Sequence, residues 1–182
     1  MKKVVIIGVL IVVLIIGASF VVRMQNSVDE TENTTEYMEF SGNGVTLSAP
    51  GDWVSAESES NTTLLAVADP NSKDSSGFSN VNINIEKKNS SNSLDYEFKS
   101  NYNSLSRNSD YDILYEGNVT IFGTNGVEAG YTTNIDGVAK QHKAIWFKKD
   151  SDLYVILCTA PQSEFTTLEP TFDLIIKSIQ IS

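Results

Sequence analysis

The chain has 182 residues, of which 41% are hydrophobic and 20% charged, and its formal net charge is −10. Lys2, Lys3 and Arg23 belong to the N-terminal segment, so the remainder sets ten basic residues against 23 acidic ones, a formal charge of −13. Phosphate binding needs a basic surface, so this balance argues against a nucleic-acid partner. Cys158 is the only cysteine and lies in an apolar run, which excludes an internal disulfide and favours a buried thiol.

An apolar run occupies residues 4–22. As a helix at about 1.5 Å per residue it would span about 28 Å, close to the roughly 30 Å hydrocarbon layer of a membrane. Lysines precede the run and acidic residues follow Arg23, so we predict a single-pass transmembrane anchor over residues 1–23 with a cytoplasmic N-terminus and an extracellular domain. Its length exceeds that of a usual signal core, which favours retention. Gly17-Ala18-Ser19 nevertheless offers a cleavage site, and cleavage would give a secreted protein.

Residues 24–37 are polar and acidic without an apolar period, and they predict a flexible stalk. Residues 38–182 are enough for one domain with its own core. Four strand-like segments open this domain, at residues 37–40, 45–49, 62–68 and 81–86. In the last of them apolar Val81, Ile83 and Ile85 alternate with polar residues, which predicts a half-buried strand with one wet face.

A helix is expected next, capped by Asn92 or Ser93 and reaching about Ser106. Its apolar residues at helical spacing are Leu94, Phe98, Tyr102 and Leu105. Residues 111–115 and 119–122 then predict two separate strands, and Asn125-Gly126 predicts a turn into the next segment.

Residues 126–179 are the segment around which the rest of the chain is organised. Alternation from Val127 predicts a strand, and the Asp136-Gly137 turn predicts a hairpin with the strand that follows. Residues 144–147 and 153–158 are apolar at both parities, so we predict that they lie in the central strands of the sheet.

A closing helix is predicted after Ala160-Pro161, which should end the last strand because proline lacks the backbone N–H. Ser163 is its expected N-cap, and Pro170 is expected to mark a break or restart. One apolar stripe of this helix should lie on the sheet, formed by Phe165, Leu168, Phe172, Ile175 and Ile179.

In its order of motifs the chain resembles the PsbP-like domain family, named after an extrinsic subunit of photosystem II. The resemblance covers roughly residues 38–181, is densest after residue 120, and rests on Pro50-Gly51-Asp52-Trp53, Gly123, Ala129, Tyr131, Tyr154, Ala160-Pro161 and the ending 172–179. It implies an α+β fold, with an antiparallel β-sheet flanked by helices, and a non-catalytic accessory or binding role. It implies no functional residue here, because the photosynthetic member's contact residues lie in an extension with no counterpart.

Catalytic and metal sites have few candidate residues. His142 is the only histidine, and its neighbours Lys140, Gln141 and Lys143 predict a wet, structural position rather than a catalytic one. Gly-x-Ser-x-Gly motifs are absent, and one His with one Cys does not make a usual zinc site. Oxygen ligands alternate over residues 69–74, but glycine is missing at the sixth position, so only a weak, irregular calcium site remains.

Six aromatic residues could either line a ligand pocket or pack in the core, and their spacing at strand and helix periods favours core packing. They are Trp53, Tyr131, Trp146, Tyr154, Phe165 and Phe172.

The sequence predicts a membrane-tethered, extracytoplasmic binding or accessory module that docks on another envelope or membrane protein. No catalytic, cofactor-binding or metal-binding residue is assigned, and no cofactor is expected. A small-ligand or calcium-binding surface sensor is the alternative, and a hydrolase using His142 is the third hypothesis. Fold alone does not choose between them.

Overall fold

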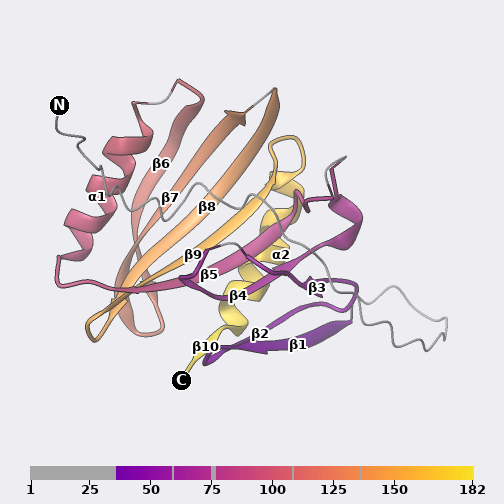
Figure 1. Cartoon of the computed structure of the whole chain (residues 1–182), viewed down its shortest axis with the longest axis horizontal. Coiled ribbons are helices and arrows are strands. Elements are labelled where there is room, and N and C mark those ends of the chain that lie inside the picture. The colour runs from indigo at the N-terminus through magenta and orange to yellow at the C-terminus, as the bar shows by residue number, and fades with distance from the viewer. Residues whose placement is uncertain (1–35, 59, 75–76, 108, 136) are drawn as a thin grey trace, which may run out of the picture.

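The computed structural model describes residues 36–182 except 59, 75–76, 108 and 136 (Figure 1). Two antiparallel sheets and two α-helices make up most of this part of the chain, which confirms the predicted α+β class, although a single sheet was expected. The large sheet has the order β3 (Val54–Ser55), β4 (Thr63–Ala68), β5 (Asn82–Asn89), β9 (Asp152–Pro161), β8 (Val138–Lys149), β7 (Thr124–Ile135), β6 (Tyr111–Ile121). The small sheet has the order β1 (Tyr37–Gly42), β2 (Val45–Pro50), β10 (Gln180–Ile181).

The prediction that residues 144–147 and 153–158 lie in the central strands of the sheet is confirmed. β9 stands in the middle of the seven-stranded order, and β8 is its neighbour. Their hairpin turns at Asp150, whose φ is 57°, and pairs Lys149 with Asp152. β7 and β8 form the predicted hairpin, with Ile135 opposite Val138.

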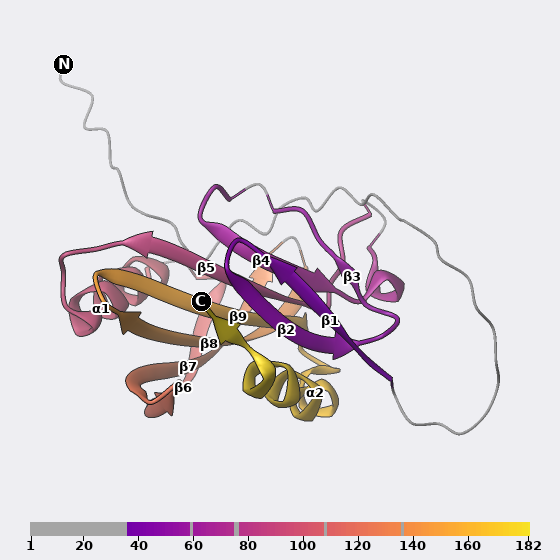
Figure 2. The same cartoon turned by 90° about the horizontal axis from the view of Figure 1, so that it is seen from below.

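One face of the large sheet is covered by α2 (Phe165–Ser178) and by the small sheet (Figures 1 and 2). Leu47 of β2, Phe172 and Ile175 of α2 and Ile156 of β9 share this core. Its side chains come from segments far apart in the sequence, so this core is complete only when the C-terminal helix α2 packs against the sheet.

The opposite face carries α1 (Leu94–Leu105), which packs against the β7–β8–β9 part of the sheet. Ser93 is its N-cap, and its hydroxyl accepts a hydrogen bond from the Tyr96 N–H at 3.2 Å. Phe98 and Tyr102 stack with ring centroids 4.3 Å apart and both contact Trp146 of β8. The predicted cap and apolar side are confirmed. A second hydrophobic core therefore lies under α1.

The segment between the helix and the hairpin differs from its prediction. β6 is one strand over Tyr111–Ile121, and a bulge at Leu114 shifts its register against β7. The break was expected at the polar residues 116–118, but these continue the pairing with β7, with Gly117 opposite Glu128.

The turn from β6 to β7 was also misplaced. It lies at Phe122-Gly123, where φ is 49° and 74°, and not at Asn125-Gly126. Gly126 instead lies within β7, where an added Cβ would approach the Trp146 carbonyl oxygen to 2.8 Å. This glycine allows a close approach of neighbouring backbones and does not make a turn.

Two expectations for the closing helix were wrong. Glu164 is the N-cap of α2 in place of Ser163, and it makes no side-chain capping bond. Pro170 lies inside a continuous helix, without a break. Phe165 before the proline and Phe172 after it are both buried in the same core, so packing on each side offsets the lost backbone hydrogen bond.

The predicted anchor over residues 1–23 and most of the predicted stalk lie outside the described residues. Of the helices that the structure does describe, none combines the length and the apolar character needed to cross a membrane.

Candidate functional site

β5 carries the largest departure from the predicted surface. Its polar face was expected to be wet, but Asn82, Asn84 and Glu86 are only 5%, 1% and 6% exposed. They lie on the face of the sheet that also carries α1, opposite in parity to the core residues Ile83 and Ile85. These three polar side chains are therefore buried on the α1 face of the sheet, but they are not part of the hydrophobic core under α1.

A cavity lies above this row. It is small, with about 20 Å³ of free volume, room for about one water molecule, and it opens toward solvent. The pairing of β4 with β5 explains the hollow, because Ala66 is opposite Asn84 and Ala68 is opposite Asn82. The methyl side chains leave room that larger residues would fill. The rest of the lining comes from Ala56, Glu57, Ser58, Phe78 and Ser79.

Both asparagines have a fixed amide orientation. The Nδ2 of Asn84 donates to Glu86 Oε1 at 2.8 Å, and the Nδ2 of Asn82 donates to the Ser79 carbonyl at 3.1 Å. The Ser79 carbonyl oxygen and the Glu86 carboxylate both accept hydrogen bonds. The amide group facing each of them must therefore be the NH₂ group, which fixes the orientation of both amides. The two Oδ1 atoms are buried and accept no hydrogen bond from any described residue. Buried polar atoms without partners are uncommon, and here two of them belong to residues that line one cavity.

Glu86 adds a buried carboxylate to this row. It accepts hydrogen bonds from Asn84 and from the Thr62 hydroxyl, the latter at 3.2 Å. Burial raises the pKa of Glu86 and outweighs these two hydrogen bonds, which lower it. Among the described residues no Lys, Arg or His forms an ion pair with it. Glu86 lines a separate hollow with Thr62, Lys87 and Lys88, and it is not among the residues that line the cavity over Ala66 and Ala68.

His142 lies on the same face but belongs to a different environment. It is 9% exposed, so its predicted wet position was wrong, while the structural role is supported by its contacts. Its Nε2 and Nδ1 atoms each lie 3.0 Å from a threonine hydroxyl, of Thr133 and Thr159, and its ring stacks on Tyr131. Burial, aided by the charge of Lys140, lowers the pKa of His142 to about 3. A neutral imidazole between two hydroxyls does not match the hydrolase hypothesis, which required Ser or Asp beside it in a cleft.

In the loop of residues 69–74, the candidate calcium site, two carboxylates accept hydrogen bonds from backbone N–H groups of the loop region. Asp69 Oδ1 accepts the Asn71 N–H at 2.8 Å and caps the short 3-10 helix η1 (Pro70–Ser72). Asp74 Oδ1 accepts the Phe78 N–H at 3.0 Å. Across the described residues no group of three or more His, Cys, Asp or Glu side chains is placed to hold a metal ion.

The six candidate aromatics are all buried, each with no more than 6% of its surface exposed, so their assignment to core packing is confirmed.

Lys143 holds α2 against the sheet on the other face. Its Nζ lies 2.8 Å from Asp173, 3.4 Å from Glu169 and 3.7 Å from Glu128. Burial lowers the pKa of Lys143, but the Asp173 hydrogen bond and the surrounding acids outweigh it and raise the pKa. This cluster ties α2 to β7 and β8.

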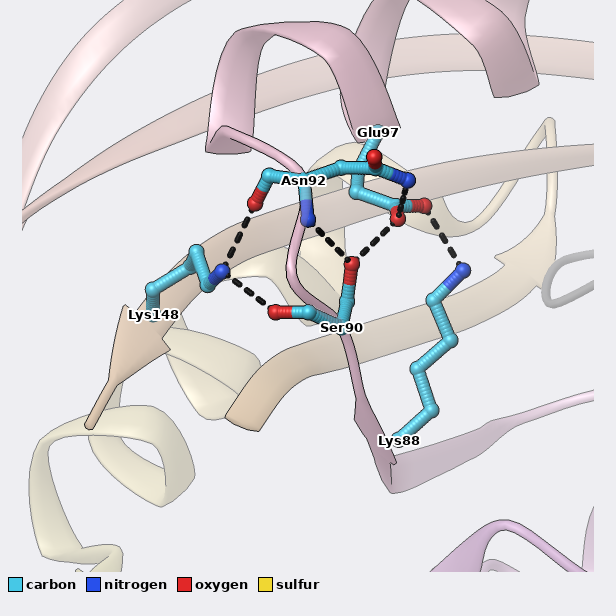
Figure 3. A network of polar contacts seen from close by, with 5 residues as sticks. All are labelled: Lys88, Ser90, Asn92, Glu97 and Lys148. Carbon is cyan, nitrogen blue, oxygen red and sulfur yellow. Dashed lines mark hydrogen bonds and ion pairs between the residues drawn. The ribbon is translucent and has the colours of Figure 1, made fainter. Parts of the chain in front are cut away.

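A second polar network anchors the start of α1 (Figure 3). Glu97 accepts hydrogen bonds from Lys88 at 2.7 Å, from Asn92 at 2.9 Å and from the Ser90 hydroxyl. Lys148 donates to the carbonyl oxygens of Ser90 and Asn92, each at 2.7 Å. The network joins β5, the segment before α1 and β8.

Three consecutive apolar residues are exposed at the edge of the large sheet. Ile113, Leu114 and Tyr115 of β6 are 40%, 49% and 39% exposed, with the acids Asp112 and Glu116 on either side. β6 is the last strand in the order, so this patch lies at a sheet edge. We call these three residues the β6 patch.

These features place the chain among α+β domains built on an antiparallel sheet with a helix on each face. The family model described as PsbP-like protein matches residues 4–181. The chain belongs to the PsbP-like protein family, and the predicted resemblance is confirmed. A search of curated proteins returned no match.

Two solved structures share the fold. Cyanobacterial PsbP (CyanoP) from Synechocystis sp. PCC 6803 is 11% identical, with a TM-score of 0.59 over 86% of this chain and 98% of that one. LpqN of Mycobacterium tuberculosis, described as involved in cell envelope biogenesis, is 14% identical, with a TM-score of 0.55 over 81% and 91%. At these identities the likeness shows the fold alone.

Proposed function

We propose that this chain is a membrane-tethered, extracytoplasmic binding or accessory module that docks on another envelope or membrane protein. Members of the PsbP-like family are generally non-catalytic accessory proteins. One solved structure of this fold, LpqN, is described as acting in cell envelope biogenesis. The apolar run of residues 4–22 supplies the tether in this proposal.

The β6 patch is the observation that supports docking on another protein. Its three residues are consecutive and exposed at a sheet edge, and exposed apolar surface bordered by polar residues marks sites of interaction. Asp112 and Glu116 frame the patch, so its partner should combine an apolar centre with basic residues at its rim. The bulge at Leu114 disturbs the edge of the strand, so we expect contact through these side chains rather than by addition of a partner strand.

The predicted stalk limits where the partner can lie. Fully extended, residues 24–37 would reach roughly 50 Å at about 3.5 Å per residue. As a flexible chain they would span about 20 Å on average. The partner is therefore a membrane protein or one held close to the membrane.

A pull-down of the tagged chain from detergent-solubilised native membranes tests this function. We expect one partner in near-stoichiometric yield, and we expect the double variant I113S/L114S to lose it. Leu174→Ser is the matched control, because Leu174 is an isolated exposed leucine on α2, 52% exposed. Recovery of no specific protein, or equal recovery by the I113S/L114S variant, would contradict docking through the β6 patch.

A further inference from the structure

The chain contains four Asn-x-Ser/Thr motifs, the acceptor sequence for N-linked glycans, at Asn33, Asn61, Asn89 and Asn118. Asn33 lies outside the described residues. The other three asparagines are exposed, so the structure allows them to be compared. A motif suited to carrying a glycan in the folded domain presents both its asparagine amide and its third-position hydroxyl at the surface, and the sugar replaces no existing contact.

Two of the three motifs do not meet these conditions. The Asn89 Nδ2 donates to the Ser151 hydroxyl at 3.2 Å and to Asp152 Oδ1 at 3.4 Å, so a sugar on this nitrogen would replace an N–H group that is already used. In the motif of Asn61 the third residue is Thr63, whose hydroxyl oxygen is buried. Neither motif is therefore fully presented by the folded domain.

The motif of Asn118 meets both conditions. Asn118 and Thr120 are exposed on β6, and Val119 between them packs against the α2 core. Residues two apart on a strand point to the same face about 7 Å apart, so the amide and the hydroxyl lie side by side on the face away from α2. Within the described part of the chain the Asn118 side chain makes no hydrogen bond that a sugar would replace.

The position of Asn118 gives such a glycan a structural consequence. β6 is the last strand of the large sheet, and residues 115–121 pair with β7 without a shift of register. A regular free edge of this kind is a template for pairing with another chain. A bulky polar group at Asn118 would cover it. Asn118 is four residues from Leu114, about 13 Å along the strand, so the glycan and the β6 patch occupy different parts of β6.

We infer that Asn118 carries an N-linked glycan, which covers the free edge of β6 over residues 115–121. The inference rests on the proposed extracytoplasmic position, where a transferase would use a lipid-linked oligosaccharide as donor. The Asn118 Nδ2 forms a bond to the anomeric carbon of the sugar as the bond from that carbon to the phosphate oxygen breaks. The lipid phosphate leaves with the bonding electron pair, and the amide nitrogen gives up one proton to a base of the transferase.

Mass spectrometry of tryptic peptides from the full-length chain, purified from native membranes, tests the inference. The peptide of residues 108–140 contains four asparagines but only the motif of Asn118. We expect it to carry the mass of a sugar in most copies, localised to Asn118 by fragmentation. The peptide of residues 89–99, which begins at Asn89, should be unmodified. An unmodified Asn118, or a sugar on Asn89 in its place, would overturn the inference.

Variants expressed in the native host show whether the motif directs the modification. Thr120→Val keeps Asn118 but removes the hydroxyl, so the sugar should be lost, whereas Thr120→Ser keeps the hydroxyl and should retain it. Asn125→Gln is the matched control, because Asn125 is exposed and lies opposite Thr120 on β7 but belongs to no motif. Its sugar content should equal that of the unmodified chain. A sugar retained at Asn118 by the Thr120→Val variant would overturn the inference.

Labelling of intact cells with a membrane-impermeant amine reagent separates this inference from the proposed function. A labelled chain with an unmodified Asn118 would overturn the glycan and leave the extracytoplasmic position intact. An unlabelled chain would contradict that position and the glycan together. Asn118→Gln should still recover the docking partner, because Asn118 lies outside the β6 patch.

Discussion

At the scale of single residues, burial decides which charges the protein carries. His142 is a basic side chain that is 9% exposed and forms no ion pair with any described acidic residue. The hydroxyls of Thr133 and Thr159 match a neutral imidazole, which has one donor and one acceptor. The fold therefore holds this histidine uncharged at a pH where an exposed histidine would begin to take up a proton.

This predicts an acid-sensitive step in stability. Burial and the charge of Lys140 lower the pKa of His142 to about 3, against an ordinary value of about 6.5 in the unfolded chain. Between these values the unfolded state binds one more proton, so the free energy of unfolding falls as the pH falls, by up to about 1.4 kcal/mol per pH unit.

Urea denaturation of the chain at several pH values between about 6.5 and 4.5 measures this slope, since ordinary carboxyl groups titrate mainly below that range. His142→Gln should remove the slope, whatever its effect on stability at neutral pH. Equal slopes in the two proteins would show that His142 does not cause the loss.

At the scale of elements, α1 is joined to the sheet by a polar contact at its start and an apolar one along its side. Glu97 lies in the first turns, where the positive end of the helix dipole favours a carboxylate. Burial raises the pKa of Glu97, but hydrogen bonds from Lys88, Ser90 and Asn92 outweigh it and lower the pKa to about 2. The contribution to stability is present above about pH 4.5 and is lost as the pH falls toward 2.

Glu97→Gln should therefore destabilise the protein by about 2 kcal/mol at neutral pH, because Lys88 loses its partner. Amide hydrogen exchange should quicken in α1 more than in β8 and β9. Asp95→Asn is the matched control on the same helix, since its ion pair with Lys99 is exposed and should matter little. Similar effects of the two substitutions would contradict the special role of Glu97.

Helices and strands with a regular apolar period could be predicted from the sequence, but the burial of a polar strand face could not. The Ser93 cap and the spacing of Phe98 and Tyr102 were enough to place α1. Alternation along β5 showed a polar face, but it carried no sign that Ala56–Ser58 and Phe78–Ser79 lie over that face. The candidate site was missed for this reason, since its burial comes from segments distant in the sequence.

Short elements and turns were missed for other reasons. β3 and β10 have two residues each, too few to show a period. Asn125-Gly126 has the chemistry of a turn, yet the pairing of Ile121 with Thr124 places the reversal at Phe122-Gly123. Local chemistry permits several turns, and strand register selects one of them.

At the scale of the whole molecule, one sheet separates two hydrophobic cores. Successive residues of β9 point into different cores, with Ile156 on the α2 side and Leu157 on the α1 side. The two tryptophans are divided in the same way, Trp53 in the α2 core and Trp146 in the α1 core. Because both cores share the central strands, loss of either should remove support for the other.

We therefore expect the domain to unfold in a single cooperative transition. In the single-tryptophan variants Trp53→Phe and Trp146→Phe, the remaining fluorophore reports one core each, and each variant should show the same denaturation midpoint by fluorescence and by circular dichroism. Ile156→Ala and Leu157→Ala should each lower the free energy of unfolding by about 2 to 5 kcal/mol without separating the two signals. If Leu157→Ala shifted the Trp146 transition while the Trp53 transition stayed in place, the two faces of the sheet would be independent folding units.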